Sequence, residues 1–417
     1  MKIKKIVSIC VGMSLVGASS LAIAQSAPVK PTYEIPSGNS PKDSSKDSSK
    51  DGPRDIQLTD GVNLSPFANL TVGHDDNLFL TNTGRTASNF YIFNPGLRLV
   101  GKTSYVKLGV DYGAKLGRYT SSSADNYNDQ RVYGTAEWSF SGKAGLRLAE
   151  LYEQGHDPRG STDRGISSRP DEYYNTGPSA LFAYGGNGAA GRFEVEAGSF
   201  KKRYTNNRSS TFASDRDTDN YAGRFFFRVA PKTSLLVEVR EDKFDYIAPS
   251  SLLDSKERRY LAGVTWEATA ATTGTVKVGQ IRKDFASPAR ADYSTSGWEA
   301  NVQWTPLTYS KFDFFTSKSF GESTGLGDFI LSKRYGAIWN HAWDSRLSSA
   351  VSASRNEDSF TGNPRRDSTD SMGFKLTYKP MRWLSLGGEY IYTSRDSNIG
   401  IYNYKKNLYM FTVGATL

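Results

Sequence analysis

The residue types that most often carry out chemistry are few and scattered in this 417-residue chain. The three histidines are His74, His156 and His341, and none stands in an H-x-x-H or H-E-x-x-H pattern. The sequence therefore predicts no metal site. His156 is followed by Asp157 and is the best candidate for a general base, but no serine motif accompanies it. A serine nucleophile needs a base beside it, so we predict no catalytic residue and no enzyme.

Thiol and cofactor chemistry is also excluded by composition. The only cysteine, Cys10, lies in the predicted signal peptide, so the exported chain has no thiol for redox chemistry or metal binding. The formal net charge is +9, but acidic and basic residues are interspersed along the chain. This pattern is not a nucleic-acid footprint. We predict neither a cofactor nor a nucleic-acid partner.

One acidic cluster has the oxygen ligands that a hard cation prefers. It is Asp75, Asp76 and Asn77, in the segment Gly73-His-Asp-Asp-Asn-Leu-Phe79. No glycine-spaced series of further acids follows, as a calcium loop would require. We favour an Asx-rich strand end or turn over a cation site.

The elements that position the charged residues are strands. In Val106–Leu116, apolar side chains at even positions interleave with Lys107, Asp111 and Lys115, and comparable segments recur to the end of the chain. A period of two indicates half-buried strands. The polar face is too charged for a dry core, whereas the apolar face is nearly free of charge, as a lipid-facing surface must be.

The charged face is predicted to line a hydrated lumen. Its candidates are Arg98, Lys107, Asp111, Lys115, Arg131, Glu137, Arg192, Glu194, Glu196, Arg224, Arg228, Glu238, Arg240, Glu299, Asp313, Lys375 and Glu389. Both signs are present, which suits passage of a polar polymer because the wall offers hydrogen bonds without one dominating field. The alternative for any one of them is that it pairs across strands and keeps the wall wet.

The predicted fold is all-β, a single transmembrane antiparallel β-barrel of about 18 strands (16–18). Short turns near residues 102–103, 141–143, 230–233, 269–274, 305–309, 344–345 and 379–381 alternate with longer polar loops. This alternation is typical of short periplasmic turns and long extracellular loops. Aromatic residues recur at strand ends before short turns, as in Trp304-Thr-Pro306, and fit an interfacial girdle. Leu146–Glu153 alternates poorly, and we expect a bulge there.

The sequence predicts three regions: a signal peptide, a tail and the barrel. Residues 1–24 are predicted to be a signal peptide, with three early lysines, an apolar stretch and the small-x-small site Ala22-Ile-Ala24; a membrane anchor is the alternative. Residues 25–60 are rich in proline and contain a Lys-Asp-Ser-Ser repeat, which predicts a disordered periplasmic tail, either a linker or a tether. Residues 61–417 are the predicted barrel, in a Gram-negative outer membrane.

The C-terminus ends on an alternating strand. Its apolar positions are Tyr409, Phe411, Val413, Ala415 and Leu417. A chain ending on such a strand resembles outer-membrane barrel proteins, whose last strand is read by the barrel insertion machinery. Family members usually end in an aromatic residue, and Leu417 departs from this. A terminal strand of a soluble sandwich is the alternative from this segment alone.

The segment containing Asp75, Asp76, Asn77 and Phe79, together with turns such as Trp304-Thr-Pro306, resembles a known family. It is the outer-membrane barrel family associated with exopolysaccharide-biosynthesis operons, the EpsL-type β-barrel porins. The resemblance covers about residues 61–417. It implies a channel for, or an accessory to, export of an exopolysaccharide.

Three functions follow as expectations. The resemblance favours polysaccharide export, with a polysaccharide and periplasmic export components as partners beside outer-membrane lipid and lipopolysaccharide. The alternative is a general or solute-selective porin for small molecules, and the third is a structural or polymer-binding protein. A long loop folded inward would favour the porin, whereas aromatic residues clustered in the lumen would favour a sugar track.

Overall fold

The structure is a computed structural model that describes residues 55–416 except 166, 187 and 270. The predicted signal peptide, nearly all of the predicted tail, and Leu417 lie outside the described residues. The elements are β1 (Ile56–Thr59), β2 (Val62–Asp75), β3 (Ser88–Lys102), β4 (Val106–Tyr119), η1 (Ser123–Asp125), β5 (Tyr127–Ser141), β6 (Ala144–Asp157), β7 (Asp171–Tyr184), β8 (Gly191–Tyr204), α1 (Arg208–Thr211), η2 (Phe212–Ser214), β9 (Arg216–Ala230), β10 (Thr233–Tyr246), β11 (Ser255–Thr269), β12 (Thr272–Phe285), β13 (Tyr293–Leu307), β14 (Ser310–Glu322), β15 (Phe329–Ala342), β16 (Leu347–Thr361), β17 (Arg366–Met381), β18 (Leu384–Ser397), η3 (Gly400–Tyr402) and β19 (Tyr404–Thr416).

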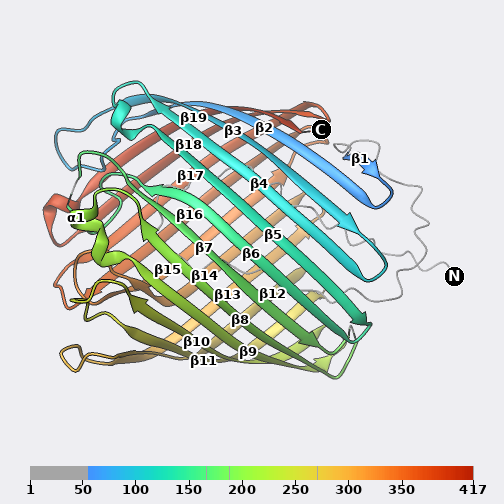
Figure 1. The fold of residues 1–417 in the computed structure, drawn as a ribbon. Helices are drawn as coiled ribbons and strands as arrows, with labels where there is room; N and C mark the ends of the chain where they lie inside the picture. The colour runs from blue at the N-terminus through green and yellow to red at the C-terminus, as the bar shows by residue number, and fades with distance from the viewer. Residues whose placement is uncertain (1–54, 166, 187, 270, 417) are drawn as a thin grey trace.

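Strands β2 to β19 form a closed barrel of 18 antiparallel strands. Each strand pairs with its neighbours in sequence, and β19 closes the ring by pairing with β2 from Leu408↔Asp75 to Thr416↔Phe67. The strands run obliquely around the wall, with α1 and the longer loops at one end and the short turns at the other (Figure 1). The predicted fold class is confirmed. A barrel of this strand number encloses a lumen wider than its own side chains fill.

The two faces of the wall differ as the period of two predicts. On β10, Leu235, Val237 and Val239 are 47%, 53% and 49% exposed. Glu238, between them, is 4% exposed. Exposed large apolar side chains recur at alternate positions around the barrel, so the outer surface is a lipid-facing band. Among the described helices, none is long and apolar enough to cross a bilayer.

Short and long connections alternate, as predicted. The sequence predicts seven short turns, and the structure has an eighth, between Tyr184 at the end of β7 and Gly191 at the start of β8. Gly185 and Gly188 there adopt positive φ angles of 111° and 88°, which is the glycine signal that could have revealed this turn. The first long loop, residues 76–87, connects β2 and β3.

Aromatic residues gather on the outer face beside the short turns. Trp304 packs against Phe312 with ring centroids 5.1 Å apart, and Phe312 stacks on Trp339 at 5.9 Å. His341 lies in the same group, 4.4 Å from the Trp343 ring. Large rings with one polar atom suit the boundary between lipid and water.

The expected bulge in Leu146–Glu153 is wrong. Strand β6 pairs continuously with β7, and its pairing with β5 is irregular only at the turn, between Ser139 and Ser141. The poor alternation has another cause: Glu150 occupies an outward position between exposed Leu148 and Tyr152. A carboxylate therefore faces the lipid side without any change of register.

The predicted tail extends to Asp60, but its last residues are structured. Strand β1 pairs with β2 through Ile56↔Leu64 and Gln57↔Asn63. Gly61 takes a φ of 79° in the Asp-Gly turn between them. An Asp-Gly step between alternating residues is a hairpin signal, so the sequence did contain the information.

Candidate functional site: the lumen wall and the outer mouth

The register puts all seventeen predicted lumen residues on the wall face opposite the exposed apolar side chains. Many stand directly opposite a charge of the other sign. Arg98 faces Asp111, and Lys375 faces Glu389 with an Nζ–Oε2 distance of 3.2 Å. Opposite charges on paired strand positions attract and stabilise the register.

A continuous chain of ion pairs crosses the inner wall from β9 to β13. Arg224 Nε lies 2.7 Å from Glu238, and Lys277 Nζ lies 3.0 Å from the same carboxylate. Lys277 also contacts Glu299 at 2.6 Å, and Arg259 contacts Glu299 at 3.1 Å. These lumen charges pair across strands, which is the alternative predicted for any one of them. Lys277 and Arg259 were not predicted, although the alternation of ionisable residues in β11 and β12 would have revealed them.

Residues 158–165, in the long connection between β6 and β7, fold against the inner side of the mouth; we term this segment the inner loop. Its Arg164 contacts inward-facing groups at the outer ends of the strands. The guanidinium lies 2.7 Å from the Asp171 carboxylate and 4.7 Å from the centre of the Tyr204 ring, and it is 5% exposed. Earlier in the loop, Arg159 lies over the Phe79 ring at 4.0 Å. The inner loop therefore bends over the lumen instead of away from the barrel.

Asp163 ties the inner loop to the connection between β14 and β15, some 160 residues away. The carboxylate accepts hydrogen bonds from the Ser323 hydroxyl (2.9 Å) and from the backbone N–H groups of Thr324 (2.9 Å), Gly325 (3.2 Å) and Leu326 (2.9 Å). Successive N–H groups pointing at one carboxylate form an anion nest. We term this contact the mouth latch.

The tip of the β14–β15 hairpin turns inward to meet the latch. The β13–β14 ladder ends at Trp298↔Lys318. Beyond it, Glu322 is buried and hydrogen-bonds to Lys283 Nζ and to the Tyr246 hydroxyl (2.7 Å), which lie on inward positions of β12 and β10. Alternation along β14 would point Glu322 outward, so the tip has left the wall and leans over the lumen.

Apolar rings fill the space behind this tip. Ile281, Phe320 and Phe329 are buried together, with Phe285 and Tyr293 packed against them. The Phe320 and Phe329 rings meet edge to face with centroids 5.0 Å apart. These rings contact one another and are largely covered, so they fasten the hairpin and do not form a row of exposed faces for sugar stacking.

The cluster Asp75, Asp76 and Asn77 closes the barrel. Lys406 of β19 pairs with Asp75, and the Asp76 carboxylate accepts the backbone N–H of Asn407 at 2.7 Å. The Asn77 amide donates to the carbonyl of Lys405 at 2.9 Å, and the Asp75 carboxylate accepts the N–H of Asn77. The carboxylate oxygens of Asp75 and Asp76 thus contact backbone N–H groups and Lys406, which agrees with the predicted Asx-rich turn. No group of three or more His, Asp or Glu in the described chain is arranged to hold a metal ion.

The described residues of the predicted C-terminal signal face outward. Tyr409, Phe411 and Val413 are 51%, 47% and 36% exposed, and Tyr409 packs on Tyr390 at 5.0 Å. Ala415 continues the same face. Recognition of this strand by insertion machinery stays a prediction.

A family model matches residues 63–417, which is the whole closed barrel. The chain belongs to the family described as "Putative beta-barrel porin 2". Porins are channels and not enzymes, so membership agrees with the prediction that the chain is not an enzyme. A barrel of this family lies in the lipid and lipopolysaccharide of a Gram-negative outer membrane, as the sequence predicts.

Solved structures show the same fold. Pseudomonas aeruginosa OccK9 (OpdG) is similar with a TM-score of 0.52 at 10% identity, covering 87% of this chain and 100% of that one. Pseudomonas aeruginosa OccK2 (OpdF) gives 0.50 at 12% identity, covering 86% and 98%. Pseudomonas aeruginosa OpdK with vanillate gives 0.50 at 11%, covering 85% and 99%. No curated protein matches the chain. None of these findings connects it to exopolysaccharide operons.

Proposed function

We propose that this porin is a passive channel for small polar solutes, which is the predicted alternative to polysaccharide export. The observation that carries the proposal is the mouth latch. It joins the inner loop to the inward-leaning β14–β15 hairpin. Two long connections that meet over the lumen narrow the path from outside, which suits selection among small solutes more than passage of a polymer.

The chemistry of the wall supports the same proposal. Charges of both signs line it in pairs, as in the chain from Arg224 to Arg259. Such a wall offers hydrogen bonds and local fields to a small polar solute. OpdK, a barrel of the same fold, has been solved with vanillate, a small aromatic carboxylate. Organic acids are therefore the first solutes to test.

Polysaccharide export rests on the resemblance alone. The aromatic cluster that would favour a sugar track is buried between the hairpin and the wall. Export therefore remains the second hypothesis, and the same experiment tests it.

The deciding measurement is permeability of the full-length protein in planar bilayers and proteoliposomes. We expect discrete conductance steps and uptake of organic acids, amino acids and disaccharides, with a polysaccharide excluded. A barrel that passes the polymer, or one that conducts nothing, would overturn the proposal. Deletion of the coding sequence provides the cellular counterpart. Loss of growth on a scarce small nutrient supports the porin, and periplasmic accumulation of polymer supports export.

A further inference from the structure

A polar pocket lies at the outer end of the barrel wall, between β5 and β6. These strands pair as far as Gln130↔Gln154. Beyond that point β5 still pairs with β4, ending at Tyr127↔Gly117, and β6 still pairs with β7, ending at Asp157↔Asp171. The two strand ends thus separate from each other while each stays attached to its other neighbour. A cavity of about 390 Å³ occupies the gap; we term it the seam pocket.

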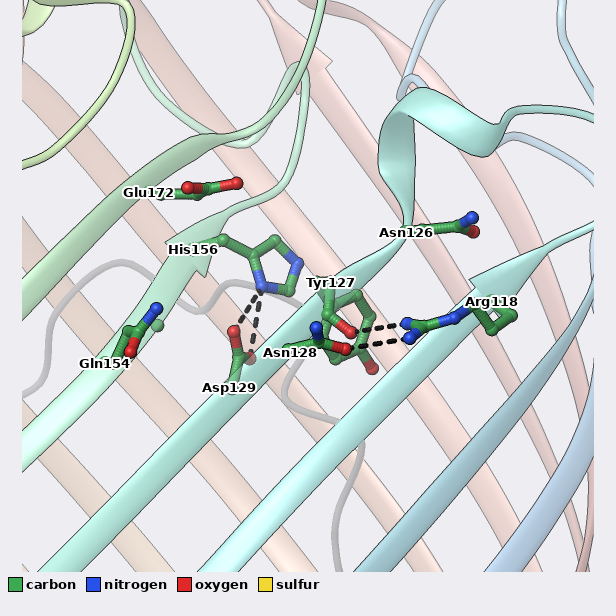
Figure 2. A pocket seen from close by; sticks show the side chains of 9 residues that line it. Arg118, Asn126, Tyr127, Asn128, Asp129, Gln154, His156 and Glu172 are labelled. Carbon is green, nitrogen blue, oxygen red and sulfur yellow. Dashed lines mark hydrogen bonds and ion pairs between the residues drawn. The ribbon is translucent and has the colours of Figure 1, made fainter.

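The back of the seam pocket is fixed by contacts among its own residues (Figure 2). His156 Nδ1 lies 2.9 Å from the Asp129 carboxylate, and the His156 ring packs on the Tyr127 ring with centroids 4.2 Å apart. The Arg118 guanidinium donates to the carbonyl of Tyr127 and to the Asn128 amide oxygen, both at 2.9 Å. Polar groups held in this way need little rearrangement to bind a ligand.

Glycine makes this arrangement possible. A Cβ at Gly117 would lie 2.1 Å from the Tyr127 ring. The ring can therefore lie flat against β4 only because position 117 has no side chain.

The front of the seam pocket carries exposed polar side chains. Arg118, Asn128, Gln154 and Glu172 are exposed and line it. Among the described residues, the side chains of Gln154 and Glu172 have no hydrogen bond or ion pair. An amide, a carboxylate and a guanidinium around one cavity can donate to and accept from several neighbouring hydroxyl groups at once. This lining suits a saccharide and repels an acyl chain.

The pocket opens outward, above the lipid-facing band. Gln154 follows the exposed Leu148 and Tyr152 on the same face of β6. Strand β6 has 14 residues, so it is about 46 Å long and, at a tilt near 45°, rises roughly 33 Å. The apolar band of an outer-membrane barrel is about 25 Å tall. The end of β6 therefore stands among the headgroups, which in the outer leaflet are sugars and phosphates.

We propose that the seam pocket binds the saccharide headgroup of an outer-leaflet glycolipid, lipopolysaccharide. The Gln154 amide donates to and accepts from sugar hydroxyls, the Glu172 carboxylate accepts from them, and Arg118 donates to a hydroxyl or phosphate oxygen at the rim. The acyl chains of the same molecule lie against the apolar band below. Arg118 and Gln154 lie on the outward face of the wall, so the site anchors and orients the barrel in its leaflet without taking part in conduction.

The test is a titration of the purified full-length protein with a rough-type lipopolysaccharide that carries lipid A and core sugars. The variant combines Gln154→Ala with Glu172→Ala, and the matched control combines Gln280→Ala with Glu357→Ala, which are also outward-facing. We expect about tenfold weaker binding in the pocket variant, the effect of losing one or two hydrogen bonds. The affinity of the control variant for lipopolysaccharide should change less than twofold. Unchanged affinity in the pocket variant, or an equal loss in the control, would overturn the site.

Two further measurements keep the outcome clear. The released core oligosaccharide is titrated separately; if it binds as tightly as the whole glycolipid, the pocket takes a soluble saccharide and the lipid-anchored assignment is wrong. Gln154→Cys and Gln280→Cys proteins carrying a photo-crosslinker report on otherwise unaltered barrels. We expect a glycolipid adduct at position 154 and little at 280, and the reverse contradicts the proposal.

Discussion

Removing the Asp163 carboxylate should open the outer mouth. In Asp163→Ala the mouth latch loses four hydrogen bonds to one buried carboxylate, which is 6% exposed as a residue. Hydrogen bonds to charged groups contribute about 1.5–3 kcal/mol each and are not additive, and the freed N–H groups regain water once the loop lifts. We take about 2–4 kcal/mol for the latch, which shifts the closed-to-lifted equilibrium roughly 30- to 800-fold. Asp163→Asn keeps a hydrogen-bond acceptor without the charge, so its shift of this equilibrium should lie between those of wild type and Asp163→Ala.

The assay is single-channel conductance in planar bilayers, with solute uptake into proteoliposomes beside it. We expect larger or more frequently interrupted conductance steps and faster entry of larger solutes for Asp163→Ala. Asp344→Ala is the matched control, because Asp344 also caps backbone N–H groups, those of Arg346 (2.6 Å) and Leu347 (2.8 Å), but at the opposite end of the barrel. Equal conductance of Asp163→Ala and wild type, or an equal change in Asp344→Ala, would refute a narrowing role for the latch.

Three more predictions follow from single groups. Glu238→Gln leaves Arg224 and Lys277 with one counter-charge fewer, so we expect a shift of the reversal potential toward anions. A unit charge at about 4 Å in water is worth about 1 kcal/mol, roughly fivefold in local anion concentration, and an unchanged potential would place this chain of ion pairs off the solute path. Glu150→Leu should raise the free energy of unfolding in lipid by about 1–2 kcal/mol, because a lipid-facing carboxylate is unfavourable; a loss of stability would mean that Glu150 has a partner in the membrane. Hydrogen bonds from the N–H groups of Arg346 and Leu347 hold the pKa of Asp344 below its ordinary value of 3.8, so its stabilising effect is present above that pH and is lost as the pH falls further. The difference in melting temperature between wild type and Asp344→Asn should therefore shrink in acid, and a difference that grows would contradict this.

The sequence by itself determined the strands, their two faces and the order of short and long connections. Apolar residues such as Val237 and charged residues such as Glu238 alternate within one strand, and a strand has no other way to place neighbouring side chains than on opposite faces. For the same reason the seventeen charged candidates could be assigned to one face without knowledge of their partners. The Asp-Gly turn before β2 and the glycines near residue 185 were local signals that the sequence contained and that the prediction did not use.

Only the tertiary structure decided how the mouth is built. The mouth latch joins Asp163 to residues 323–326, and no local pattern relates two loops that far apart in sequence. Alternation also fails at Glu322, because the hairpin tip leaves the wall, and burial against Tyr246 replaces the outward position that the strand period implies. The seam pocket likewise depends on where the ladder between β5 and β6 ends, beyond which Tyr127 and His156 pack across the two strands. Periodicity reports which face a side chain takes on a strand, whereas the closure of one segment over another depends on contacts that exist only once the barrel has formed.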